Sequence, residues 1–129
     1  MPKDFTWAER GRIDELRYYI IKENQLLGYR SGIIKPLGIK EMAKIFNAGE
    51  RQIKDLVKKM KKNNILKEVS INGIAWYAFN PLYGLKGKRI TYTIFTIFQE
   101  ELTSVLPIKV VNTFILQAEE IKDNIKIIE

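Results

Sequence analysis

The charge of this chain is concentrated in one stretch of sequence. Residues 35–67 contain ten Lys or Arg and three Asp or Glu, which gives a net charge of +7. The whole chain of 129 residues also carries +7, so the charges outside this stretch cancel. Because solubility alone does not require such a concentration, the stretch predicts an anionic partner, with nucleic acid as the first choice.

The charged stretch has the pattern of two helices joined by a tight turn. A short helix is expected over residues 39–47 and a longer one over residues 50–63. Asn47 and Gly49 lie between them and tolerate the left-handed backbone that a sharp turn needs. Four apolar residues of the longer helix fall at i, i+3, i+4 and i+7, which predicts one buried face. These residues are Ile53, Leu56, Val57 and Met60.

A β-hairpin is predicted directly after the second helix. Two segments within residues 65–80 flank Asn72 and Gly73, the pair most typical of a two-residue type I′ turn. Helix, tight turn, helix and hairpin follow one another in the order of a winged helix-turn-helix domain. We therefore expect a mainly α fold with a small β-hairpin. Residues 1–106 form the expected winged helix-turn-helix domain, and residues 107–129 form a C-terminal helical extension.

One helix and one connector are predicted before the charged stretch. Thr6 and Glu9 have the spacing of a capping box. Apolar residues then recur at helical intervals, at Ile13, Leu16, Ile20 and Leu27. We expect a helix over residues 6–27. An irregular connector should follow over residues 28–38, where three glycines and a proline interrupt any periodic pattern.

Two further helices are predicted after the hairpin. Residues 90–106 alternate like a strand at first, but later apolar residues follow helical spacing, which favours a helix. Residues 108–129 predict a final helix with an apolar seam of alternating three- and four-residue steps. The seam contains Val111, Phe114, Ala118, Ile121 and Ile125. It either folds back on the chain's own core or pairs with a second copy, and we favour pairing, which implies a homodimer.

Composition excludes several classes of chemistry. The chain has no cysteine and no histidine, which removes disulfides, Cys nucleophiles, Cys/His zinc sites and His bases. Adjacent carboxylates on a helix point in different directions, so they predict no metal site. The sequence also contains neither a run of eighteen apolar residues nor an apolar signal segment near its start. We expect a cytoplasmic protein without enzymatic activity, cofactor, metal or membrane contact.

The longer charged helix carries side chains suited to reading duplex DNA. The major groove admits one helix, and Arg, Gln and Asp can recognise guanine, adenine and cytosine edges there. The expected base-reading residues are Arg51, Gln52, Lys54 and Asp55. Lysines give affinity through phosphates without sequence information; the expected phosphate contacts are Lys40, Lys58, Lys59, Lys62 and Lys67. The wing tip would consist of Ser70, Asn72 and Gly73.

The region from residue 35 to about residue 98 also resembles a known family. It has a Pro-Leu lead into the first helix, the segment EMAKIF, a hairpin strand ending in Asn-Pro, and KGKRI after it. In these features it is similar to winged-helix proteins of plasmids and phages of low-GC Gram-positive bacteria, the RepL-type replication proteins and related phage regulators. The resemblance implies DNA binding in replication initiation or in transcription control.

These observations predict a sequence-specific double-stranded DNA-binding protein that regulates transcription. A plasmid or phage replication initiator is the alternative within the same class. A winged helix that recruits other proteins without binding DNA is the alternative from a different class, because folds of this kind are reused.

Overall fold

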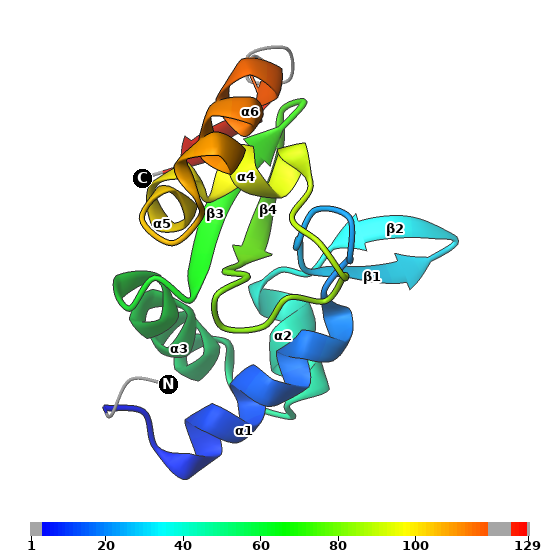
Figure 1. The fold of residues 1–129 in the computed structure, drawn as a ribbon. Helices are drawn as coiled ribbons and strands as arrows, with labels where there is room; N and C mark the ends of the chain where they lie inside the picture. Colours follow the sequence, from blue (N-terminus) through cyan, green and yellow to red (C-terminus); the bar gives the residue numbers. More distant parts are fainter. Residues whose placement is uncertain (1–3, 119–124, 129) are drawn as a thin grey trace.

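The computed structural model describes residues 4–118 and 125–128 (Figure 1). Within these residues the chain forms six α-helices, one 3-10 helix and five strands, and the strands make two antiparallel sheets. The expectation of a mainly α protein with one hairpin is therefore wrong, and the fold is mixed α and β. Three of the five strands lie in segments that the sequence predicted as a connector or as a helix.

Helix α1 spans Trp7–Leu16, and a 3-10 turn, η1, continues it over Arg17–Tyr19. The capping box at its start is confirmed, because the Thr6 hydroxyl accepts from the Glu9 N–H and the Glu9 carboxylate accepts from the Thr6 N–H. The expected continuation to residue 27 is wrong. The chain instead turns back, so that Ile20 and Leu27 form an antiparallel bridge and reach the core from that bridge.

This turn depends on Gln25, which has a positive φ of 61° and no exposed surface. Its side-chain amide donates to the carbonyls of Phe79 at 3.1 Å and Gly84 at 2.8 Å. Its side-chain oxygen accepts from the N–H of Lys86 at 2.9 Å. A buried amide is tolerated only when its hydrogen bonds are made, so Gln25 fixes the turn against the 79–86 segment.

Strands β1 (Gly28–Ser31) and β2 (Ile33–Pro36) form a hairpin where an irregular connector was expected. Gly32 stands at the tip with a φ of 76°, a conformation that favours glycine. The glycines that interrupt helical periodicity here therefore belong to a tight hairpin rather than to a loop. Figure 1 shows this hairpin projecting from the body on the side away from α3.

Helices α2 (Ile39–Ile45) and α3 (Glu50–Lys62) confirm the predicted helix pair. Asn47 has a φ of 49° in the turn, and Gly49 caps α3. The predicted apolar face of α3 is buried in full, at Ile53, Leu56, Val57 and Met60. These side chains join α1 and α2 in a first hydrophobic core, which also includes Leu66 and Phe79.

Strands β3 (Leu66–Ile71) and β4 (Ile74–Phe79) confirm the predicted hairpin. Asn72 and Gly73 both have positive φ, 53° and 81°, as a type I′ turn requires. The two faces of the hairpin serve different cores. Leu66 and Phe79 enter the first core, whereas Val69 and Ala78 enter a second core beneath the last helices.

Residues 90–106 form two short helices rather than one. Helix α4 covers Tyr92–Ile97 and α5 covers Gln99–Thr103, with Phe98 between them at a φ of −111°. The Thr91 hydroxyl caps α4 by accepting from the N–H of Ile94. Three of the apolar residues that follow helical spacing in this segment are buried in the second core: Phe95, Phe98 and Leu102. The predicted apolar face is therefore correct up to Leu102.

The last segment departs most from the prediction. Helix α6 spans Ile108–Ala118. Further along the chain, strand β5 (Ile125–Ile128) pairs antiparallel with β3. A single helix over residues 108–129 is therefore wrong. The physical reason is that three of residues 125–128 are isoleucine, a β-branched residue that favours strands, and that the segment pairs with β3, so the strand order becomes β4-β3-β5.

The apolar seam predicted for the last helix is correspondingly divided. Val111 is buried in the second core, and the ring of Phe114 stacks on Phe95 at 4.8 Å between centroids. Ile125 lies in strand β5. The side chain of Ala118 and the whole of Ile121 fall outside the described residues. The structure thus places Val111 and Phe114 against the chain's own core, which was the alternative to pairing with a second copy.

Candidate nucleic-acid interface

Helix α3 separates its residues cleanly between the core and the solvent. Its four stripe residues are buried. Seven of its polar residues are exposed: Glu50, Arg51, Gln52, Lys54, Asp55, Lys58 and Lys62. All four predicted base-reading residues and two of the predicted phosphate contacts belong to this exposed set. The structure therefore brings them together on one helical face.

The exposed cations of α3 follow one another along a single stripe. Arg51, Lys54, Lys58 and Lys62 recur at three- and four-residue steps, so they cover about 16 Å of helix length. Among the residues that the structure describes, none of these four side chains makes an ion pair. The stripe presents concentrated positive charge to solvent, which suits contact with a regularly spaced array of anions.

Lys59 points differently from this stripe. Its Nζ lies 3.0 Å from the Glu9 carboxylate, also contacts the carbonyl oxygen of Asp4, and lies 4.7 Å from the centre of the Phe5 ring. The pKa of Glu9 is lowered, chiefly because the Thr6 N–H donates to its carboxylate; burial opposes this effect and the ammonium of Lys59 adds to it. The ammonium predicted to meet a phosphate is thus bound to the start of α1.

Lys67 is likewise occupied within the chain. Its Nζ lies 2.8 Å from Glu101 and 3.1 Å from the carbonyl oxygen of Ile97, and the Phe98 ring centre is 5.3 Å away. The Lys67 side chain is only 18% exposed. This residue therefore connects β3 to α4 and α5, and a phosphate could reach it only by displacing Glu101.

Helix α2 adds two exposed cations, Lys40 in its first turn and Lys44 near its end. Lys40 was predicted as a phosphate contact, whereas Lys44 was not singled out. In a helix-turn-helix, the first helix crosses the DNA backbone. The position of Lys40 in the first turn of α2 is compatible with that geometry.

The predicted wing tip is exposed at Asn72 and Gly73, whereas Ser70 is half-buried. One side of the wing is covered, because β5 occupies the edge of β3 and places Lys126 opposite Ser70. Lys126 is exposed and brings a cation beside a hairpin tip that has none of its own. Sequence reasoning missed it because residues 108–129 were predicted as one helix, and only strand pairing brings it there.

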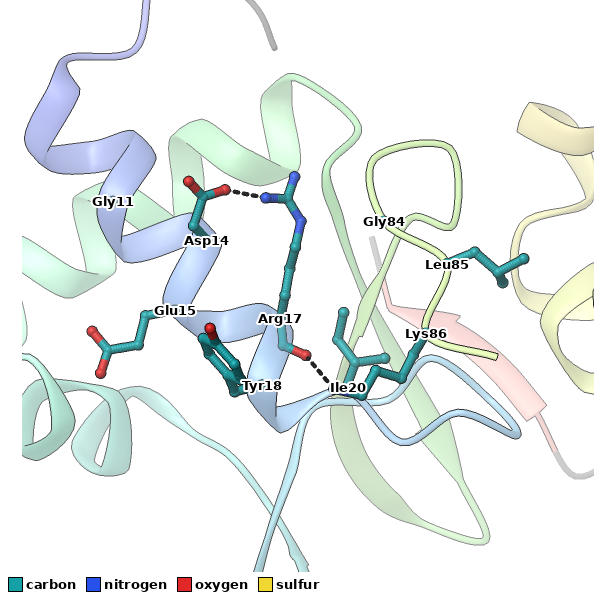
Figure 2. A pocket seen from close by; sticks show the side chains of 9 residues that line it. All are labelled: Gly11, Asp14, Glu15, Arg17, Tyr18, Ile20, Gly84, Leu85 and Lys86. Atoms are coloured by element: carbon teal, nitrogen blue, oxygen red, sulfur yellow. Dashed lines mark hydrogen bonds and ion pairs between the residues drawn. The ribbon is translucent and has the colours of Figure 1, made fainter. Parts of the chain in front are cut away.

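A groove lies beside α1, and Figure 2 shows the residues that line it. Its polar groups are used to hold the 80–86 segment. The Arg17 guanidinium donates to the carbonyl of Tyr83 at 2.7 Å and contacts Asp14, and Lys86 approaches the carbonyl of Arg17. With Glu15 also in its wall, the groove is of mixed charge and does not present a cationic surface.

Two kinds of feature are absent from the described part of the chain. Residues 4–118 and 125–128 contain no group of three or more metal-ligating side chains. They also contain no helix that is long and apolar enough to cross a membrane. Comparisons of the chain with protein-family models, curated proteins and solved structures give no match.

Proposed function

We propose that this protein binds double-stranded DNA sequence-specifically, with α3 in the major groove. The observation that supports the proposal is the exposed stripe of Arg51, Lys54, Lys58 and Lys62 on a helix whose opposite face is buried. A major groove about 12 Å wide admits one helix, and a helix held rigidly on its apolar side can present its other side to base edges.

The start of α3 carries the proposed base contacts. Arg51 would donate two hydrogen bonds to guanine, Gln52 would bond adenine, and Asp55 would accept from cytosine. Lys54 lies between them and can meet a base edge or a phosphate.

Phosphate binding is assigned to the cations that pair with no acid among the described residues. Lys58 and Lys62 continue the stripe, and Lys40 approaches from α2. Lys59 and Lys67 bind carboxylates of the same chain, so in this proposal they stabilise the fold.

The proposed biological role is control of transcription. Replication initiation, which the resemblance of residues 35–98 also implies, would use the same interface. We propose a homodimer as the binding species, since two copies of α3 could then reach half-sites one helical turn apart.

Selection of bound sequences from random duplexes, followed by a salt titration of the selected site, tests the proposal. About six phosphate contacts should give a slope near −5 in a plot of log K against log salt concentration. Arg51→Ala should relax base preference at one position, by about 1–3 kcal/mol. A flat salt response, or selection that yields no enriched sequence, would refute sequence-specific DNA binding; a flat response with no retention on heparin would favour the protein-binding alternative.

A further inference from the structure

A second pocket is lined by residues 89–91 and by helix α6. Figure 1 shows α6 at the end of the molecule away from α3. Its volume is about 580 Å³, within the range of small-molecule sites. The lining residues come from two segments that are distant in sequence: Arg89, Ile90, Thr91, Lys109, Val110, Thr113 and Phe114.

The floor of this pocket is apolar and held in place. Ile90 and Phe114 are half-buried and pack on the second core. The ring of Phe114 stacks on Phe95, which is fully buried. Thr91 fixes the wall, because its hydroxyl donates to the carbonyl of Glu23 at 2.7 Å and accepts from the Ile94 N–H. Such a floor can receive a flat or branched apolar group without rearrangement.

The rim of the pocket is positively charged. Arg89 and Lys109 are exposed, and within the described residues neither side chain makes an ion pair or a hydrogen bond. Among the described residues, no carboxylate lines the pocket, and no acidic residue lies in the first turn of α6. The N-terminal end of that helix adds partial positive charge of its own.

We propose that this pocket binds a small organic anion with an apolar body. The apolar body would lie on Ile90, Val110 and Phe114, and its carboxylate or sulfonate would lie between Arg89 and Lys109. A neutral apolar molecule would leave the two cations without a partner, and a bare inorganic anion would leave the floor in water. The proposal is independent of DNA binding, because it uses no residue of α3.

Fluorescence titration of the full chain with two probes tests this assignment. The aromatic sulfonate anilinonaphthalenesulfonate carries the proposed charge, whereas the otherwise similar phenylnaphthylamine is neutral. We expect one sulfonate site per chain, with a preference of about tenfold over the neutral probe at low salt, because two exposed cation contacts each contribute modestly. The combined variant Arg89→Gln and Lys109→Gln should lose this preference while still binding both probes.

Matched variants separate this pocket from the charged face of α3. Lys88→Gln removes one positive charge from the residue next to Arg89. Lys58→Gln with Lys62→Gln removes two positive charges from α3. Both variants should bind the sulfonate as the wild type does. Thr113→Trp should fill the pocket and abolish binding of both probes, with circular dichroism confirming the fold. The proposal is overturned if the Arg89 and Lys109 variant keeps its preference, if the α3 variant loses it, or if many probes bind per chain.

Discussion

The core around α1–α3 and the core around α4–α6 differ in the sequence distance over which their parts are joined. In the first core, the helix pair of residues 39–62 forms its apolar contacts within one short segment. In the second core, β5 at residues 125–128 pairs with β3 at residues 66–71. Local patterns are read easily from sequence, whereas contacts between distant segments require the chain to close long loops. The first core was accordingly predicted well and the second was not.

The part of the chain up to residue 67 and the part after it also differ in charge; we call them the first and the second region. Residues 1–67 contain sixteen basic and eight acidic residues, whereas residues 68–129 contain six basic and seven acidic residues. The acidic residues Glu68 and Glu101 lie in the second part and bind Lys61 and Lys67 of the first. Part of the positive charge that looks available in sequence is therefore used to join the two regions.

The largest expected effect tests whether the two cores unfold together. Phe95→Ala in the second core should destabilise the protein by about 3–5 kcal/mol, because it removes a fully buried ring and its stack on Phe114. Ile53→Ala is the matched change in the first core, at about 2–5 kcal/mol. Since β3 and β4 contribute to both cores, each variant should show one cooperative thermal transition. Two separated transitions would contradict this shared framework.

The second-largest expected effect is on DNA affinity, and it compares exposed cations of α3 with an exposed cation of the second region. Lys58→Gln combined with Lys62→Gln should weaken binding to every duplex by roughly fiftyfold per bound chain at 0.1 M salt and reduce the salt slope by about two per chain, because each copy loses two phosphate contacts. Lys88→Gln, an exposed lysine of the second region, is the control and should leave both quantities unchanged. Fluorescence anisotropy with a labelled duplex measures both. Because Lys88→Gln removes one charge and the α3 variant removes two, a loss half as large on a logarithmic scale would show that binding follows overall charge rather than the face of α3.

A smaller effect separates a structural lysine from a DNA contact. Lys67→Met should lower the free energy of unfolding by about 1–3 kcal/mol, because it leaves the largely buried Glu101 without its cation. Adding Glu101→Gln should recover part of this loss in urea unfolding. The salt slope of DNA binding should match that of the wild type. A slope reduced by about one would return Lys67 to the set of phosphate contacts.

The smallest effect concerns the ion pair between α1 and α3. The pKa of Glu9 in the folded chain lies below its ordinary value of 4.5, chiefly because of the hydrogen bond from the Thr6 N–H. The resulting stabilisation is present above pH 4.5 and is lost as the pH falls through the folded-state pKa. Glu9→Gln should therefore be less stable than the wild type at pH 7, by under about 1 kcal/mol.

That stability difference should shrink as the pH falls through the folded-state pKa of Glu9, and it should vanish once the wild-type carboxyl is protonated in both states. Urea unfolding at several pH values measures it. Glu15→Gln, at an exposed position on the same helix, controls for the loss of one negative charge. A difference between the Glu9 variant and the wild type that stays constant from pH 7 to pH 3 would show that the hydrogen-bonded shape of the cap matters rather than its charge.

The elements predicted correctly are those whose signals lie within a few neighbouring residues. The capping box of Thr6 and Glu9, the apolar stripe of α3 and the Asn72-Gly73 turn each depend on contacts inside one element or one hairpin. The β1–β2 hairpin lies where the glycines predict an irregular connector, because glycine is typical both of loops and of tight hairpin turns. The turn at Gln25 was missed because its support comes from residues 79–86, far along the chain.

The sequence by itself determined the amphipathic helix α3, its buried stripe and the seven polar residues that it exposes. A residue's position around a helix follows from its spacing, so this face needed no knowledge of the rest of the fold. Tertiary structure decided which lysines have partner acids and where β5 pairs. It also decided that Arg89 and Lys109 line the same apolar pocket. Each of these features depends on contacts between distant parts of the chain, which the spacing of neighbouring residues cannot predict.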